Sequence, residues 1–168
     1  MLPLHDRRDH LHRYPLLAGG NPPLSNPDAS SEDSHGTRRG LIRRRRLRIL
    51  VGQNQQDERE LIGLQLAPLD HVVDFADNGA SVVNQFRSQS YDVIIVEVEL
   101  PVMDGVSVAR TIRSWELMQE LEQTPIIALT TLLSEIASPS DLMREFTDYL
   151  VKPFGQDQLL GVIRRHAG

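Results

Sequence analysis

Five polar residues that could do chemistry each follow a short apolar run in the C-terminal part of the chain. They are Gln53, Asn54, Glu97, Thr130 and Lys152. Together they offer one carboxylate, one ammonium, one hydroxyl and two amides, with a formal charge of zero, and Lys152 is the only lysine of the chain. If the runs are parallel strands of one sheet, their carboxyl ends meet at one edge, where such sheets bind ligands. We therefore expect these residues to converge in one shared pocket.

The apolar runs that would position these residues alternate with helical patterns. Strands are predicted at 47–51, 72–75, 93–96, 126–129 and 149–151, since each run is short and largely apolar, and the run 93–96 is β-branched throughout. Helices are predicted at 57–67, around 82–86, at 108–121, near 138–146 with Pro139 in the first turn, and at 155–166. Five strand–helix units predict an α/β fold, a doubly wound five-stranded parallel sheet of flavodoxin-like order.

The charge of the chain is divided between two parts. Residues 1–46 carry nine arginines against five acidic residues, a net of +4, whereas residues 47–168 carry a net of −9. The first part has five prolines and little apolar periodicity, so we predict a disordered arm over 1–46 and a domain over 47–168. The arm ends in an arginine cluster: Arg38, Arg39, Arg43, Arg44, Arg45 and Arg46. This cluster is either an anion-binding arm or a solvated tail.

Composition excludes several classes of function. The chain has no cysteine, which removes disulfides, thiol catalysis and thiolate metal sites. Its apolar runs are too short to cross a bilayer and its first residues lack an apolar signal region, so we expect a cytoplasmic protein with no membrane partner. No serine–histidine–acid arrangement is indicated, and we expect no enzyme activity.

The segment Asp92–Gly105 resembles the phosphoacceptor strand and the following loop of the receiver domains of two-component response regulators. Two further segments lie at suitable spacing. Pro125–Thr130 is similar to the family's fourth strand with its switch hydroxyl, and Asp148–Phe154 is similar to its Lys-Pro-Phe signature. The resemblance covers about residues 47–166 and implies the receiver fold. The long third helix is most like that of receivers fused to hybrid histidine kinases.

The positions that match the family's acidic site are altered. Glu97 stands in place of the phosphoacceptor aspartate, and Gln53 and Asn54 stand in place of an acidic pair. The family's Mg²⁺ would keep only weak candidate ligands, namely Glu97, the Asn54 amide oxygen and the backbone carbonyl of Glu99. Because ligand charge sets the affinity for a hard dication, we expect no Mg²⁺ and no other cofactor. Asp104, in the loop that follows, is expected to cap or solvate a turn.

The positions that match the family's switch are retained. The resemblance assigns Thr130 and Tyr149 to the switch, and Lys152 and Pro153 to a lysine–proline pair joined by a cis peptide bond. Glutamate extends its carboxylate by one methylene relative to aspartate, roughly 1.5 Å. Glu97 can then meet Lys152 where a phosphoryl group would lie, either as a partial phosphate mimic or as a leftover ion pair.

Three functions remain as hypotheses. The first is a stand-alone atypical receiver that signals by protein–protein contact without phosphorylation, with a histidine kinase or another signalling protein as its partner. Its partner surface would be the fourth helix, the fifth strand and the fifth helix, around Tyr149. The second is a phosphoacceptor in a phosphorelay. The third is a binder of nucleic acid or an anionic surface through the arginine cluster of the arm.

Overall fold

The computed structural model describes residues 45–131 and 139–168. A five-stranded sheet runs through this part of the chain, with all its strands parallel and in the order β2-β1-β3-β4-β5. The strands are β1 (Arg48–Gly52), β2 (Val72–Ala76), β3 (Val93–Glu97), β4 (Ile126–Thr130) and β5 (Asp148–Val151). The predicted flavodoxin-like order is confirmed, and its strand order reverses between β1 and β3.

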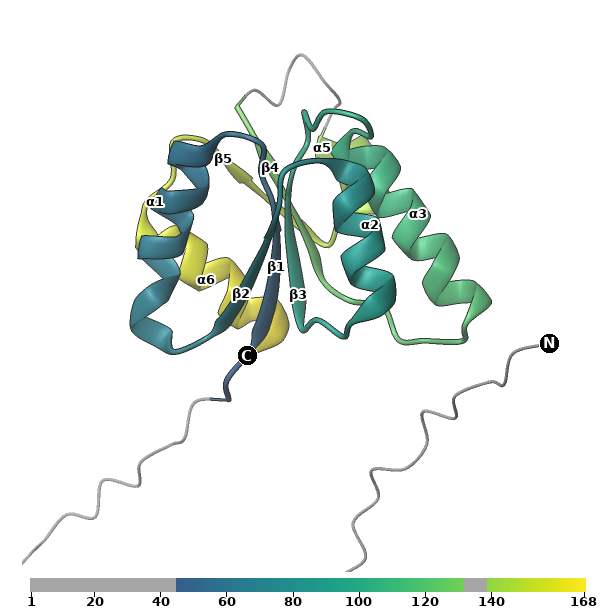
Figure 1. Ribbon diagram of the computed structural model, residues 1–168, viewed down its shortest axis with the longest axis horizontal. Coiled ribbons are helices and arrows are strands. Elements are labelled where there is room, and N and C mark those ends of the chain that lie inside the picture. The colour runs from purple at the N-terminus through teal and green to yellow at the C-terminus, as the bar shows by residue number, and fades with distance from the viewer. Residues whose placement is uncertain (1–44, 132–138) are drawn as a thin grey trace, which may run out of the picture. The chain divides into compact units, whose positions relative to one another are not determined.

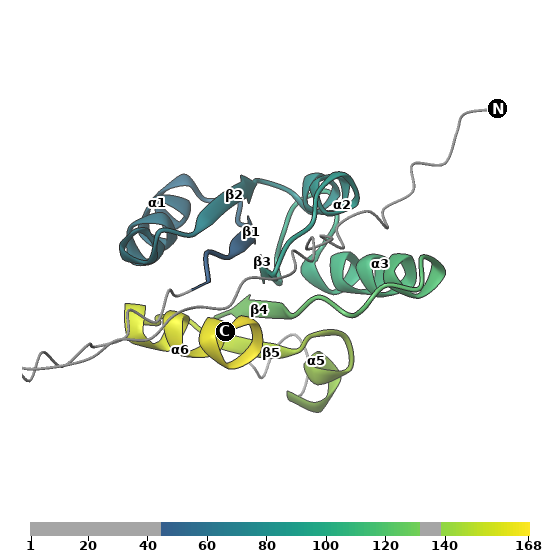
Figure 2. The same ribbon diagram turned by 90° about the horizontal axis from the view of Figure 1, so that it is seen from below.

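Helices cover both faces of the sheet, as Figures 1 and 2 show. They are α1 (Gln56–Leu66) with the short 3₁₀ helix η1 (Ala67–Leu69), α2 (Gly79–Ser88), α3 (Gly105–Met118), α5 (Pro139–Glu145) and α6 (Gln156–Ala167). Helices α1 and α6 lie on one face, and α2 and α3 lie on the other (Figure 2). In the described part of the chain, no helix combines the length and the apolar character that crossing a membrane requires.

Alternate side chains of the central strands fill two apolar cores, one on each face of the sheet. The core under α2 and α3 takes Leu50 of β1 and Ile94 of β3. The core under α1 and α6 takes their neighbours Ile49 and Ile95. All four side chains are fully buried, which explains why the strands read as continuous apolar runs.

The third helix is shorter than the sequence predicts. We expected it to reach Leu121, but α3 ends at Met118. Glu120 adopts a left-handed φ of 53°, and its N–H donates to the carbonyl of Leu117 over 3.3 Å. The N–H of Leu121 donates to the carbonyl of Glu116 over 2.9 Å. These two bonds form a Schellman motif, which ends a helix by satisfying its last carbonyls.

The fourth predicted helix starts where the proline requires. Helix α5 begins at Pro139, in agreement with the prediction that this residue occupies the first turn. Proline suits this position because its fixed φ is helical and its missing N–H would have no intrahelical partner there. Residues 132–138 lie outside the described part of the chain.

The described chain begins inside the arginine cluster of the predicted arm. Residues 1–44, with four arginines of the cluster, lie outside the described residues. The last two arginines lie inside them and contact the domain. Arg45 forms an ion pair with Asp92, and the Nε of Arg46 donates to the backbone carbonyl of Asp70 over 2.9 Å.

Candidate functional site

The carboxyl ends of the strands place the predicted polar residues at one edge of the sheet, which is the upper edge in Figure 1. Gln53 follows β1, Glu97 ends β3, Thr130 ends β4, and Lys152 follows β5. Gln53 and Thr130 are buried, and Glu97 is only 6% exposed. Asn54, the fifth predicted residue, is exposed. Four of the five residues therefore lie along this edge in surroundings with little access for water.

Lys152 is the centre of a hydrogen-bonded network. Its Nζ donates to Oε2 of Glu58 over 2.7 Å and forms an ion pair with Oε2 of Glu97. The Nε2 of Gln53 donates to the same two oxygens, over 2.7 Å to Glu58 and 3.0 Å to Glu97. Each of these carboxylate oxygens accepts from both an ammonium and an amide, so the donors and acceptors of the pocket satisfy one another.

Glu58 is a pocket residue that the sequence analysis missed. It lies in the first turn of α1 and is partly buried, with 29% of its side chain exposed. A helix that starts directly after β1 places its first turn at the carboxyl edge of the sheet, and this position is the signal that could have identified it. With Glu58 included, the formal charge of the pocket is −1 rather than zero.

Burial and the two carboxylates shift the ionisation of the pocket. Burial raises the pKa of the Glu97 carboxyl; the donors Lys152 and Gln53 lower it, and Glu58 raises it further, so that its pKa stays above its ordinary value. Burial by itself would lower the pKa of Lys152, but the hydrogen bonds and negative charges of Glu58 and Glu97 outweigh this effect and raise that pKa. Lys152 is therefore held as a cation, while Glu97 is harder to ionise than an exposed glutamate.

The loop between β1 and α1 holds Gln53 in its orientation. The Oε1 of Gln53 accepts from the backbone N–H of Gln55 over 3.1 Å, which leaves its amide N–H groups to face the two carboxylates. The Nη1 of Arg59 donates to the backbone carbonyls of Gln53 and Asn54, over 2.8 and 2.9 Å. Asn54, whose side chain is exposed, thus stabilises the loop through its backbone carbonyl.

The loop after β3 positions the backbone of Glu97. The N–H of Gly105 donates to the carbonyl of Val98 over 2.8 Å, and a Cβ at Gly105 would lie 2.5 Å from the carbonyl oxygen of Glu97. This close approach requires glycine. Asp104 caps α3, as the sequence indicated, because its side chain accepts from the N–H of Ser107 over 2.8 Å.

The residues assigned to the switch lie on β4 and β5, the two strands that precede Lys152 in the chain. Thr130 is buried, and its carbonyl accepts from the N–H of Lys152 over 2.8 Å. Tyr149 is partly buried and packs against the core under α2 and α3. The peptide bond between Lys152 and Pro153 is cis, as the resemblance implied.

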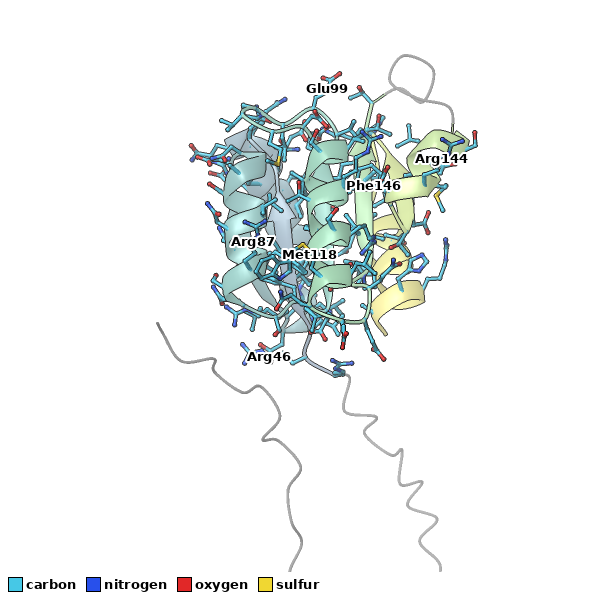
Figure 3. All side chains as sticks on the ribbon, turned by 90° about the vertical axis from the view of Figure 1, so that its right-hand side faces the viewer. Arg46, Arg87, Glu99, Met118, Arg144 and Phe146 are labelled. Atoms are coloured by element: carbon cyan, nitrogen blue, oxygen red, sulfur yellow. The ribbon has the colours of Figure 1, made fainter. Side chains whose placement is uncertain are left out.

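The donor set of the pocket does not fit a Mg²⁺ ion. Mg²⁺ requires oxygen ligands, but Gln53 directs amide N–H groups at Glu97, whose Oε2 also binds the Lys152 ammonium. Glu99 is exposed in the loop at the carboxyl edge (Figure 3). Within residues 45–131 and 139–168, no group of three or more His, Cys, Asp or Glu side chains could hold a metal ion.

Fold and site together define a class of protein. A doubly wound parallel sheet brings a carboxylate at the end of β3 and a lysine that follows β5 together at its carboxyl edge, which is the arrangement of a receiver-type signalling domain. Residues 49–164 match the family of the response regulator receiver domain. The chain belongs to this family, and it is a receiver domain of two-component signal transduction.

Curated relatives include a transcription factor, a response regulator and a sensor protein. The chain is 31% identical over 122 residues to the transcription factor prr1 of Schizosaccharomyces pombe, covering 73% of this chain and 22% of that protein. It is 30% identical over 116 residues to the response regulator ArlR of Staphylococcus epidermidis, covering 69% and 50%. For the sensor protein GacS of Pseudomonas syringae, the match is 32% over 92 residues, covering 55% and 10%. The chain thus spans between a tenth and a half of the length of these relatives.

Solved structures of receiver domains share the fold. The receiver domain of the sensor histidine kinase PA1611 from Pseudomonas aeruginosa, crystallised with a magnesium ion in its active-site cleft, is 29% identical with a TM-score of 0.65, covering 74% of this chain and 99% of that one. The chemotaxis response regulator CheY4 of Vibrio cholerae is 26% identical with a TM-score of 0.62, covering 72% and 98%. The Saccharomyces cerevisiae Ssk1 receiver, in complex with the phosphotransfer protein Ypd1, is 23% identical with a TM-score of 0.66, covering 73% and 89%, and supports the fold alone.

Proposed function

We propose that this receiver domain signals through protein–protein contact without being phosphorylated, with Glu97 bound to Lys152 in place of a phosphorylated aspartate. The observation that carries the proposal is that two carboxylates, those of Glu97 and Glu58, share the one ammonium of Lys152. A residue can shift a conformational equilibrium only through its differential interaction with the two states, and the Lys152 contact is the interaction that would differ.

Glu97 and Glu58 together present about the charge of a phosphoryl group. A phosphoryl group carries about −1.5 to −2 at neutral pH, and a single ionised glutamate carries only −1. Two ionised carboxylates at Lys152 carry −2, and both reach the same nitrogen. The pair therefore mimics a phosphorylated site more fully than Glu97 by itself could.

The same contacts oppose phosphoryl transfer to Glu97. Oε2 of Glu97 accepts from both Lys152 and Gln53, so a carboxylate that attacked phosphorus through this oxygen would first have to break these contacts. Transfer also needs a cation that neutralises the charge on the phosphoryl group. Gln53 supplies amide N–H groups where such a cation would need oxygen ligands.

We propose a histidine kinase or a histidine phosphotransfer protein as the partner. The complex of Ypd1 with the Ssk1 receiver is a precedent for this kind of partner. On this chain, the surface formed by α5, β5 and α6 carries apolar side chains that are exposed, namely Met143 (46%) and Val151 (39%). Exposed apolar groups on α5 and on β5, the strand that carries Tyr149, support this surface as the site of contact.

A phosphorylation assay tests whether the domain can accept a phosphoryl group. The chain is incubated with a small phosphodonor and Mg²⁺, and its intact mass is then measured. We expect no gain of phosphate by the wild-type chain. The matched control is the triple variant Gln53→Asp, Asn54→Asp and Glu97→Asp, which restores the family's acidic site and should gain one phosphate. A clear gain by the wild type would overturn the proposal and favour a phosphoacceptor.

Partner binding separates a phosphate mimic from a leftover ion pair. If Glu97 acts as a mimic, Glu97→Ala should weaken binding of the kinase or phosphotransfer partner, whereas the exposed control Glu99→Ala should not. Circular dichroism would verify that both variants are folded. Equal binding by the wild type and Glu97→Ala would show that the ion pair has no signalling role.

A further inference from the structure

A second surface lies away from the pocket, where α2 and α3 run side by side on one face of the sheet (Figures 1 and 2). Here the side chains line a shallow, open hollow of about 250 Å³, which we name the α2–α3 groove. Its lining residues are Arg87, Arg110, Thr111, Ser114, Trp115 and Met118. Figure 3 shows Arg87 and Met118 on this side of the molecule, below the loop that carries Glu99. The groove is therefore separate from the carboxyl edge that holds Lys152.

Helical spacing explains the shape of the groove. Thr111, Ser114, Trp115 and Met118 follow one another at i, i+3, i+4 and i+7, so they share one face of α3. The first two are small, which leaves space above them, while Trp115 and Met118 are large. Met118 is 73% exposed and the adjacent Leu117 is 82% exposed. Of these two side chains, Met118 lines the groove, and its exposure leaves apolar surface there that a partner could cover.

Arg87 gives the groove its charge. Its guanidinium lies over the ring of Trp115, 4.8 Å from the ring centroid, a stacking arrangement that holds the cation in place. Among the described residues, no carboxylate lies within ion-pair distance of Arg87, whereas Arg110 is paired with Glu145 over 2.8 Å. The groove has no acidic lining residue, although residues 47–168 as a whole carry a net charge of −9.

We propose that the α2–α3 groove binds an acidic amphipathic helix of a partner protein. Apolar residues of such a helix would cover Trp115 and Met118, and a glutamate or aspartate beside them would pair with Arg87. This is the helix-in-groove mode of recognition, in which anchors recur at i, i+3 or i+4 and i+7. Tryptophan and arginine are the side chains that most often dominate binding energy at such interfaces.

The proposal can be tested on the full chain without a label. Trp115 is the only tryptophan, so its fluorescence reports directly on occupancy of the groove. The probes are two synthetic helical peptides with the same leucine face, one bearing glutamate and the other lysine at the flanking positions. We expect the glutamate peptide to change the emission of Trp115 saturably and with an affinity that falls as salt rises. The lysine peptide should have no such effect.

Variants of the arginine identify its role. Arg87→Ala should weaken binding of the glutamate peptide roughly tenfold, as expected when an interface arginine is truncated. The matched control is Arg164→Ala, an exposed arginine on α6, which covers the other face of the sheet. This control should bind as the wild type does, and circular dichroism would establish that both variants are folded.

Three outcomes would overturn the proposal. They are equal binding of the two peptides, no binding of the glutamate peptide up to millimolar concentration, and unchanged binding by Arg87→Ala. Sedimentation of the chain without peptide tests the alternative occupant. A dimer that Arg87→Ala dissociates would assign the groove to a second copy of this chain instead.

Discussion

The Nζ of Lys152 lies 2.7 Å from Oε2 of Glu58, although the two residues are 94 positions apart in the chain. The contact joins the segment after β5 to the first turn of α1, and it gives the single lysine a second carboxylate besides Glu97. A partly buried cation with two anionic partners affects stability differently when the cation or one of the carboxylates is removed, and the first two predictions use this difference.

Glu58→Gln should lower the free energy of unfolding by about 1–2 kcal/mol, because Lys152 loses a charged partner but keeps Glu97. Urea unfolding at neutral pH measures the change. Glu60→Gln is the matched control on the same helix: Glu60 is exposed and contacts only Gln56 over 3.0 Å among the bonds of the described residues. The control should stay within about 0.5 kcal/mol of the wild type. If the two variants were equally stable, Glu58 would have no structural role in the pocket.

Lys152→Met should destabilise the domain by about 3–5 kcal/mol at neutral pH, because two partly buried carboxylates lose their cation. The loss raises the pKa of Glu97 further above its already elevated value. A raised carboxyl pKa means that the folded state binds protons more tightly than the unfolded state. The deficit should therefore be small below about pH 4, where carboxyls are protonated in both states, and should grow as the pH rises through the pKa of Glu97.

Neutralising the carboxylates provides the check on this pH dependence. Adding Glu58→Gln and Glu97→Gln to Lys152→Met removes the unpaired charges, so most of the stability lost at neutral pH should return. Denaturant unfolding across pH compares the single and triple variants. A deficit of Lys152→Met that did not vary with pH would contradict a network based on charge.

Glu116→Ala should cost about 3–5 kcal/mol, because it leaves a largely buried arginine without its carboxylate. Glu116 is 1% exposed, and its Oε1 and Oε2 accept from the N–H of Thr124 (2.7 Å) and from Arg113 (2.8 Å). Thermal unfolding measures the effect. The neighbour Leu117 is 82% exposed, so Leu117→Ala should change stability by no more than about 0.5 kcal/mol. Similar losses in both variants would contradict a specific stabilising role of the hydrogen bonds that Glu116 accepts.

Nucleic-acid binding through the arm remains a hypothesis with a quantitative test. Arg45 and Arg46 contact the domain, which leaves four arginines of the cluster for phosphate contacts. Four contacts predict a slope of about −3.6 for log affinity against log salt on duplex DNA. Deleting residues 1–44 keeps Arg45 and Arg46 and should abolish retention. Retention that survived the deletion, or that showed no dependence on salt, would exclude the arm as the binding element.

The sequence was sufficient to predict the five strands and their order in the sheet. Continuous apolar runs such as Val93–Val96 predict strands that are buried on both faces, and alternation with helices leaves few topologies for a parallel sheet. The same alternation predicts that Gln53, Glu97 and Lys152 lie at one edge, because the carboxyl ends of all strands of a parallel sheet lie along the same edge. The predicted disorder of the arm stays a prediction, and so does the domain boundary at residue 47.

The end of α3 was not predictable from apolar spacing. Leu117 and Leu121 continue the helical pattern in sequence, yet both are exposed, while the charged Glu116 directly before them is buried. Periodicity assigns the buried face by hydrophobicity, and here hydrogen bonds to Thr124 and Arg113 compensate for burying a carboxylate. Such compensation depends on partners that only the folded chain brings close.

Sequence alone thus determined the sheet and the edge that carries the pocket, while the reading of Gln53 and Asn54 as replacements of an acidic pair stays a prediction from the resemblance. Only the tertiary structure decided that Glu58 joins Lys152, that Gln53 directs its N–H groups at two carboxylates, and that Arg87 stacks on Trp115. A buried strand can be predicted from its own segment, because its burial requires apolar residues at those positions. A contact between distant side chains depends on helix rotation and loop geometry, which no single segment specifies.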